Sequence, residues 1–282
     1  MFKRQRTGSV LCTSCGKLVG VQDETCWNCG RRNPGLWGFA PFLRRVGNDL
    51  GFGSIVLWGC SALYIASLLV DPSGIRMGGT MSLLSPSTRA LFIFGASGAI
   101  PVFGYGRWWT VLSAAWLHGG ILHILFNMMW VRQLAPDVAE LYGGSRLAII
   151  YTLSSMTGFF LSSWAGTFVG LPAILRGASF TIGASAPIFG LLGALVAYGR
   201  RGGSSHISNQ AMTYAVIIFV FGFIMPGIDN FAHLGGFLGG YAAGLLLDPL
   251  RPEGLNHLIV ALSCIALTAL SVLASFLQGA LL

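Results

Sequence analysis

The chain of 282 residues has the composition of a membrane protein, because 54% of its residues are hydrophobic and only 9% are charged. This balance excludes a disordered chain, and 40 glycines without a Gly-x-x period exclude a collagen-like one. The net charge of +8 does not indicate a nucleic-acid partner, since eight of the 17 basic residues precede the first long apolar run. That placement is typical of an orientation signal at a lipid surface.

Residues 1–45 are expected to form a separate cytoplasmic module with its linker. They contain two Cys-x-x-Cys-Gly motifs with ten residues between them, which supply Cys12, Cys15, Cys26 and Cys29. The two-residue gap lets both thiolates of a motif face one tetrahedral ion at about 2.3 Å, and the glycine permits the tight turn that follows. We therefore predict a small zinc ribbon in which all four cysteines bind one structural Zn²⁺.

The alternative of two disulfides is weaker, because Cys-x-x-Cys pairs before a basic membrane flank belong on the reducing cytoplasmic side. A redox function is weaker still, since no βαβ pattern surrounds the motifs. The module has too little apolar content for its own core, so the metal is expected to supply folding free energy, on the order of 10 kcal/mol. The sequence indicates no partner for this module.

Residues 46–282 contain repeated apolar runs of about twenty residues, the length that a helix needs to cross the hydrocarbon. An apolar run at 90–104 is short and contains three glycines and a proline, so we expect it to be re-entrant or interfacial. The fold class is therefore an all-α polytopic membrane domain behind a zinc ribbon. Its seven predicted spans lie near 52–70, 119–135, 146–166, 183–199, 211–226, 231–248 and 257–281.

The distribution of basic residues predicts the orientation of these spans. With the N-terminus inside, 13 of the 17 Lys and Arg residues fall in inner segments and four in outer segments. The positive-inside rule then places the N-terminus in the cytoplasm and the C-terminus on the outer side. Charged residues occupy the place of a signal peptide, so the start is expected to remain uncleaved.

Three polar positions inside the predicted spans carry the functional signal, because buried polar groups are costly in hydrocarbon. In the second span, His123 and Asn127 are four residues apart and share one helical face, and His118 precedes them. The fourth span opens with Ser185 in a small-residue turn, and the sixth carries His233 about one turn inside its outer end. By the predicted orientation, all of them lie in the outer half of the bilayer.

Small residues on the fourth and sixth spans recur at four-residue spacing, which lets these two helices approach closely. Ser185 and His233 are then within hydrogen-bond reach, as a nucleophile and its general base require. His123, Asn127 and the Ser185 N–H can point donors at the oxygen of a tetrahedral intermediate. A lone membrane serine usually bonds to its own helix, so the interpretation depends on the combination.

This combination resembles the rhomboid intramembrane serine proteases. The resemblance covers roughly residues 50–250, and the span at 257–281 is similar to an extra C-terminal helix of some members. It implies a six-helix bundle, a first loop at 72–117 that dips into the outer leaflet, and no catalytic cofactor. The implied substrates are transmembrane segments of membrane proteins, which enter between the second and fifth spans. The implied site is a dyad without a third acid, an oxyanion site and supporting residues: Ser185 and His233, His123 and Asn127, His118 and Gly183.

Two positions depart from the family pattern. The nucleophile is followed by Ala186 and Pro187 rather than by glycine, so the turn must need no N–H at Pro187. The Trp-Arg pair of the first loop aligns with Trp109 and Thr110, so its arginine is missing, and Arg107 lies out of register. With no acid to orient it, His233 is expected to stack on an aromatic ring, for which Phe189 is the candidate.

Other membrane enzymes and transporters fit the sequence poorly. A zinc protease needs His-Glu-x-x-His, which is absent, and an aspartyl protease needs two aspartates within facing spans, whereas the aspartates here lie at span ends. A metal transporter built on the three span histidines lacks the usual carboxylates. The remaining alternative is a catalytically inactive rhomboid-like protein that binds membrane clients.

Overall fold

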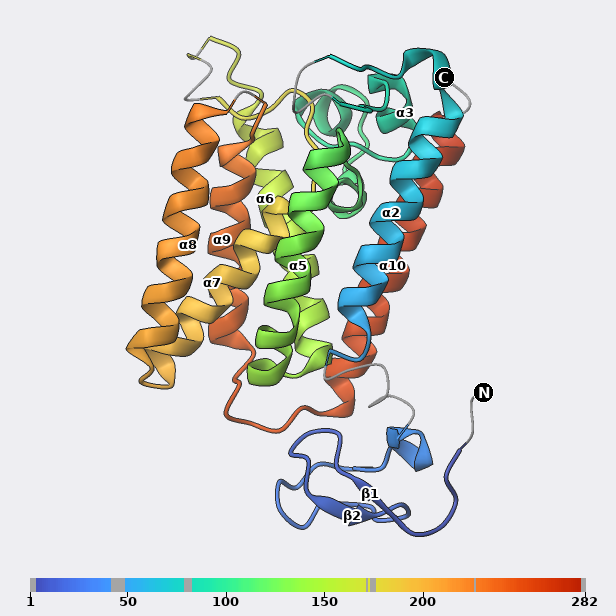
Figure 1. Ribbon diagram of the computed structural model, residues 1–282, viewed down its shortest axis with the longest axis vertical. Coiled ribbons are helices and arrows are strands. Elements are labelled where there is room, and N and C mark those ends of the chain that lie inside the picture. Colours follow the sequence, from blue (N-terminus) through green and yellow to red (C-terminus); the bar gives the residue numbers. More distant parts are fainter. Residues whose placement is uncertain are drawn as a thin grey trace.

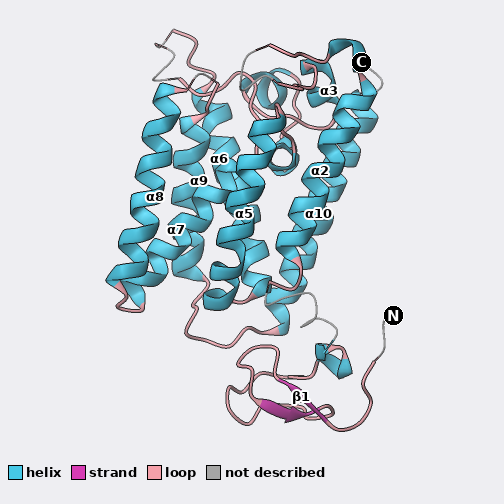
Figure 2. Cartoon of the chain, in the orientation of Figure 1, coloured by secondary structure: helices cyan, strands magenta, loops and turns pink. Residues whose placement is uncertain are grey.

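The structure is a computed structural model, and it describes residues 4–41, 49–78, 83–170, 172, 176–225 and 227–279. The predicted domain boundary between residues 45 and 46 lies outside the described residues. The described chain forms a small β module, residues 4–41, at one end of a layer of long helices (Figures 1 and 2). We call the helix ends nearest this module the module end and the opposite ends the distal end.

The cysteine module, residues 4–41, is built on one short hairpin. Strands β1 (Ser9–Leu11) and β2 (Leu18–Gly20) pair antiparallel, with Val10 opposite Val19, and the 3-10 turn η1 (Leu36–Gly38) follows. The apolar core is small: Val10, Val19, Val21 and Ala40 surround the cysteine side chains. A core of this size supplies little folding free energy, so the cysteine cluster is the structural centre of the module.

Among the residues that the structure describes, seven helices have 17 residues or more, and short helical segments lie between the first two. Four of these helices, α2, α6, α8 and α10, are long and apolar enough to cross a membrane. Helix α5 meets the same criteria when it is taken together with the segment Thr110–Trp116 before it, from which it is bent by 96°. The long helices are α2 (Phe52–Val70), α5 (Ile121–Tyr142), α6 (Gly144–Ala165), α7 (Ser185–Arg201), α8 (Ser205–Ile224), α9 (Asn230–Leu246) and α10 (Leu255–Gly279).

Helices α6, α7 and α9 form the tightly packed centre of the bundle. A side-chain carbon built on Gly240 of α9 would lie 2.0 Å from the Gly190 carbonyl oxygen of α7. One built on Gly236 would lie 2.1 Å from the Ala186 oxygen. Because no side chain fits at these contacts, the two backbones touch directly, as the four-residue spacing predicts. This close approach brings the first turns of α7 and α9 together at the distal end.

The predicted apolar run at 90–104 does not form a span of its own in the structure. Together with its neighbours it folds into short helical segments at the distal end, as an interfacial element would. The segments are η2 (Pro72–Gly74), α3 (Thr88–Ile93), the π-helical η3 (Ile100–Gly104), α4 (Thr110–Ser113) and the 3-10 turn η4 (Ala114–Trp116). Of the predicted first loop at 72–117, residues 83–117 are described without a gap, and from here on the name first loop refers to these residues.

The cysteine module is fixed to the module end of the helices through Glu253, which precedes α10. Its carboxylate lies 3.8 Å from the Arg31 guanidinium of the module, and both side chains are less than 8% exposed. The Glu253 N–H donates to Ser14 Oγ, and Glu253 Oε1 accepts from the Arg146 N–H in the first turn of α6. One carboxylate thus joins the cysteine module to two helices of the bundle.

Candidate active site

The sequence Gly183-Ala184-Ser185 leads directly into α7, whose first residue is Ser185. Gly183 has φ +127°, a conformation that favours glycine. A side-chain carbon built on it would lie 2.7 Å from His123 Nε2 and 3.7 Å from Ser185 Oγ. The glycine therefore leaves the space through which the histidine of α5 approaches the serine of α7.

His233 lies in the first turn of α9 and is 3% exposed. Its ring stacks on Phe189, one turn after Ser185 on α7, with centroids 4.2 Å apart and planes inclined by 16°. Among the described residues its buried Nδ1 has no hydrogen-bond partner, so the histidine has no carboxylate partner there. The predicted stacking of His233 on Phe189 is confirmed.

Asp229 fixes the start of α9, a role that sequence reasoning missed by treating it only as a residue at a span end. Its carboxylate accepts the Ala232 N–H at 3.0 Å, as an N-cap does, and the Ser162 hydroxyl of α6 at 2.5 Å. The His233 N–H donates to the Asp229 carbonyl oxygen. The cap sets where α9 begins, and therefore where His233 stands. The signal in the sequence was an aspartate directly before the predicted helix, because aspartate is a preferred N-cap residue.

Polar residues of α5 and of the turn before it lie near Gly183, and so near Ser185. The Gly119 N–H donates to His123 Nδ1 at 3.2 Å, so in the neutral ring the proton is on Nε2, the nitrogen next to Gly183. Asn127 is buried and donates one amide hydrogen to the His123 carbonyl oxygen, which leaves a second amide hydrogen on the same nitrogen. His118 is fully buried, with its ring 5.1 Å from that of His123.

The structure accommodates both residues that follow Ser185. Pro187 is in the first turn of α7, where the first helical hydrogen bond runs from the Ile188 N–H to the Ala184 carbonyl oxygen. An N–H at position 187 would have no partner within the helix, so proline removes nothing. Ala186 is buried against Gly158 of α6, whose built side-chain carbon would lie 3.0 Å from the Ala186 methyl group.

Arg107, rather than residue 110, supplies an arginine inside the first loop. Thr110 is buried and donates its hydroxyl to the Arg107 carbonyl oxygen at 2.8 Å. The Arg107 guanidinium is fully buried, donates to the Phe92 carbonyl oxygen, and lies 4.2 Å from the centroid of the Phe92 ring. The arginine that seemed out of register in the sequence is therefore an internal anchor of the loop.

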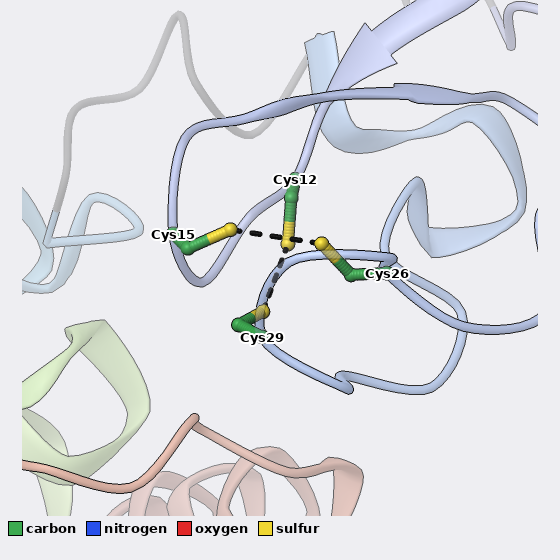
Figure 3. A group of neighbouring side chains, drawn as sticks. All are labelled: Cys12, Cys15, Cys26 and Cys29. Atoms are coloured by element: carbon green, nitrogen blue, oxygen red, sulfur yellow. Dashed lines mark hydrogen bonds between the residues drawn. The ribbon is translucent and has the colours of Figure 1, made fainter.

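The four cysteines of the module converge on one point, although they come from two separate turns (Figure 3). Their sulfur atoms lie within 4.8 Å of one another, with Cys12 Sγ 3.7 Å from Cys29 Sγ and Cys15 Sγ 3.6 Å from Cys26 Sγ. Four thiolates at about 2.3 Å around a tetrahedral ion would stand roughly 3.8 Å apart. The cluster therefore has the dimensions of a metal site, and none of its cysteines is in a disulfide.

Each half of the cluster is the same turn. The Gly16 N–H donates to the Cys12 carbonyl oxygen and the Gly30 N–H to the Cys26 carbonyl oxygen, at 3.0 and 2.9 Å. Both glycines have φ near +70°, as this turn requires. The two motifs thus give matching turns.

Without a metal ion, the four thiols do not ionise together. Burial raises the pKa of Cys29 to about 12, whereas for Cys15 the effect of burial is outweighed by hydrogen bonds from the Lys17 N–H and the Cys29 thiol, which bring its pKa to about 6. One thiolate forms easily and makes the others harder to form. A bound divalent cation removes this conflict, because it stabilises all four thiolates at once.

With this geometry established, comparison with known proteins places the bundle in a family. The Rhomboid domain profile matches residues 105–249, just over half of the chain, from the first loop to the end of α9. The chain belongs to the rhomboid family. The match begins before Arg107 and includes the segments that carry Ser185 and His233.

Relatives of this rhomboid include a named protease and an inactive member. Identity is 32% over 191 residues to "Rhomboid protease GluP" of Bacillus subtilis (strain 168), covering 67% of this chain and 35% of the relative. It is 30% over 170 residues to "RHOMBOID-like protein 4" of Arabidopsis thaliana, covering 58% and 40%. It is 32% over 162 residues to "Inactive RHOMBOID-like protein 8" of the same plant, covering 55% and 43%. The chain thus spans a third to a half of these relatives' lengths.

Family membership and the apolar helices make this rhomboid an integral, multi-pass membrane protein. The predicted fold class, a rhomboid helical bundle with one further C-terminal helix behind a four-cysteine module, is confirmed. Membership does not by itself establish proteolysis, because the relatives include an inactive one. The activity of this chain must be argued from its own residues.

Proposed function

We propose that this rhomboid is an intramembrane serine endopeptidase that hydrolyses peptide bonds in transmembrane segments of other membrane proteins. The observation that carries the proposal is the position of His233, stacked on Phe189 one turn below Ser185. Ser185 opens α7, and His233 stacks on a ring of the same helix one turn later, so the structure supplies a nucleophile and a base on adjoining first turns. GluP, a relative at 32% identity, is named as a protease, which supports the proposal.

In the proposed reaction, Ser185 Oγ attacks the scissile carbonyl carbon while His233 accepts the hydroxyl proton. His233 then gives this proton to the leaving amine, and an acyl-enzyme remains on Ser185. Water attacks the ester with His233 again as base, which releases the second product and restores the serine. In each step the His233 imidazole takes up one proton and then gives it away. The dyad therefore needs no third residue to hold a proton.

The oxyanion of both tetrahedral intermediates would be bound by three donors, of which the His123 ring lies against Gly183. His123 contributes Nε2–H, whose tautomer is set by the Gly119 N–H at Nδ1. The second amide hydrogen of Asn127 and the N–H of Ser185 are the further donors. His118, buried against the His123 ring, keeps that ring in place.

We also propose that the cysteine module is cytoplasmic and that the distal end faces the outer side, as the basic residues predict. Substrates would then be cut near the outer surface, where a client helix can unwind and enter between α5 and α8. The ion in the cysteine module is proposed to be Zn²⁺, because four thiolates in tetrahedral spacing are typical of structural zinc. This ion would stabilise the module and take no part in hydrolysis.

The proposal is tested by treating the purified full-length protein in liposomes with a fluorophosphonate probe and with a single-span reporter substrate. We expect the probe to form an ester with Ser185, identified by peptide mass spectrometry, and to block reporter cleavage in proportion to labelling. Heat-denatured protein is the control for non-specific labelling. The inactive alternative predicts a different outcome: folded protein that neither labels nor cuts, but still retains the reporter on affinity capture.

The stacked ring gives a further prediction. Replacing Phe189 by alanine is expected to lower kcat roughly tenfold while KM and expression stay near wild type, because His233 loses the surface that orients it. Leu191→Ala, a truncation of equal burial on the same helix, is the control for general core damage. Steady-state cleavage by detergent-solubilised variants measures both. Equal turnover in wild type and Phe189→Ala would remove the ring from the site.

A further inference from the structure

Helix α10 has an unusual buried face. Most of its exposed side chains are apolar, and its most apolar stretch has a mean hydropathy of 2.4, as expected where a helix faces lipid. Its buried residues are instead small or carry hydroxyls: Ala261 and, following one stripe at spacings of three and four, Thr268, Ser271, Ser275 and Gly279. In a membrane helix a stripe of small residues lets a neighbour approach closely, and its hydroxyls can hydrogen-bond to that neighbour.

Two serines of this stripe hydrogen-bond to the first loop rather than only to their own helix. Ser271 Oγ donates to the Trp109 carbonyl oxygen at 2.7 Å, and Ser275 Oγ accepts from Trp109 Nε1 at 3.0 Å. The Ser275 carbonyl oxygen accepts from Arg107 Nη2 at 2.8 Å. Both serines are at most 3% exposed. Three hydrogen bonds therefore join about one turn of α10 to residues 107–109.

Burial of the Arg107 charge costs free energy, so the hydrogen bonds that compensate for it are costly to lose. Its guanidinium is fully buried, and no carboxylate of the described residues forms an ion pair with it; its partners are two carbonyl oxygens and the Phe92 ring. A buried cation stabilised only by dipoles needs each of them, because a missing acceptor leaves charge unsolvated. Withdrawal of Ser275 would remove one of these acceptors.

The same loop holds the turn that carries the nucleophile. Directly after Trp109 come α4 and η4, and the Ala114 carbonyl oxygen accepts the Gly183 N–H at 2.9 Å. Ser97 and Thr181 exchange two backbone hydrogen bonds, at 3.0 and 2.8 Å, and so tie another part of the loop to the strand-like segment before Gly183. The loop thus stands between α10 and the Ser185 turn.

We propose that α10 is a clamp that sets the position of the Ser185 turn through the first loop, with Ser271 and Ser275 as its positioning residues. Neither serine touches substrate; each acts through Trp109 and Arg107, and the loop passes the constraint to Gly183. The inference rests on the proposed proteolysis for its kinetic consequence, but the contacts themselves do not depend on it.

The test is a double-mutant cycle of Ser275→Ala and Trp109→Phe, which remove opposite partners of one hydrogen bond. We expect each variant to slow fluorophosphonate labelling of Ser185 roughly tenfold, and the double variant to be no slower than either. For reporter cleavage, kcat should fall by a similar factor while KM changes by less than about twofold. Ser263→Ala, whose exposed hydroxyl bonds only its own helix, should match wild type.

The proposal is overturned if Ser275→Ala labels as fast as Ser263→Ala, or if the two substitutions slow labelling independently and multiply in the double variant. Should wild type itself neither label nor cut, the proposed proteolysis fails but the clamp is still decided by amide hydrogen exchange of the folded protein. Ser275→Ala should then raise exchange in peptides covering residues 107–117 and 180–184, relative to Ser263→Ala. Unchanged exchange there would refute the clamp.

Discussion

Replacing Ser185 by alanine, or His233 by alanine, is expected to abolish reporter cleavage, with a loss of kcat of at least about 10³-fold in each case. The serine variant has no nucleophile, and the histidine variant has no base to accept its proton. Because the two residues act as one unit, the double variant should be no slower than the serine variant alone. Cleavage of the reporter in liposomes, followed over hours, measures all three.

Loss of activity is separated from loss of structure by the choice of variants. Ser185 opens α7 and donates no side-chain cap there, and alanine suits a first helical turn. For His233, glutamine is a matched second variant, since it retains a polar side chain while lacking a base of suitable pKa. Thermal unfolding of each variant should lie close to wild type. Residual cleavage by Ser185→Ala above background would exclude the dyad.

The sequence predicted best what depends on short spacings. Two Cys-x-x-Cys-Gly motifs specify two identical turns, and the structure brings their sulfur atoms to metal-site distances. Four-residue repeats of small residues predicted the close approach of α7 and α9, which Gly236 and Gly240 show. The stacking of Phe189 on His233 followed from the same reasoning. In each case a local pattern fixes which face of an element meets its neighbour.

Helix ends do not follow from the apolar runs, because a run indicates which residues lie in the hydrocarbon and not how far the helix extends. The second span was expected to end near residue 135, but α5 continues through Pro136 to Tyr142. The fifth was expected from residue 211, but α8 begins at Ser205. Helical hydrogen bonds continue into polar sequence wherever the backbone allows. A hydropathy profile does not include these polar turns, so it gives no information on where the helix ends.

Contacts between residues far apart in the chain could not be predicted from the sequence. Arg107 reaches Ser275, 168 positions later, through a backbone carbonyl, and backbone acceptors leave no mark on the residue types of a motif. Glu253 lies between two predicted spans, where nothing in the sequence marked it, yet it joins Arg31 of the cysteine module to the start of α6. Such residues are recognised by burial of charge, which only the folded chain displays.

Removal of the metal from the cysteine module is expected to unfold residues 4–41 and leave the helical bundle intact. The module buries few apolar side chains, so the bound ion supplies most of its stability, on the order of 10 kcal/mol for comparable zinc sites. Cys26→Ser should act as chelation does, because it removes one of four ligands. Circular dichroism should retain its helical signal, while proteolysis should cut within residues 4–41. Loss of helicity in the bundle on chelation would contradict this.

Acidification should have the same effect by a different route, since the ligands bind as thiolates and protons compete with the metal as the pH falls. Unfolding of the module also withdraws Arg31 from Glu253, whose carboxylate retains the Arg146 N–H as a partner. Because Glu253 is not left without a partner, the bundle keeps its module end and Ser185, at the distal end, should label at the wild-type rate. Slower labelling after chelation would mean instead that the metal-bound module acts on the distal site through the helices. The rate of Ser185 labelling therefore decides whether the ion stabilises only the module or also affects the site.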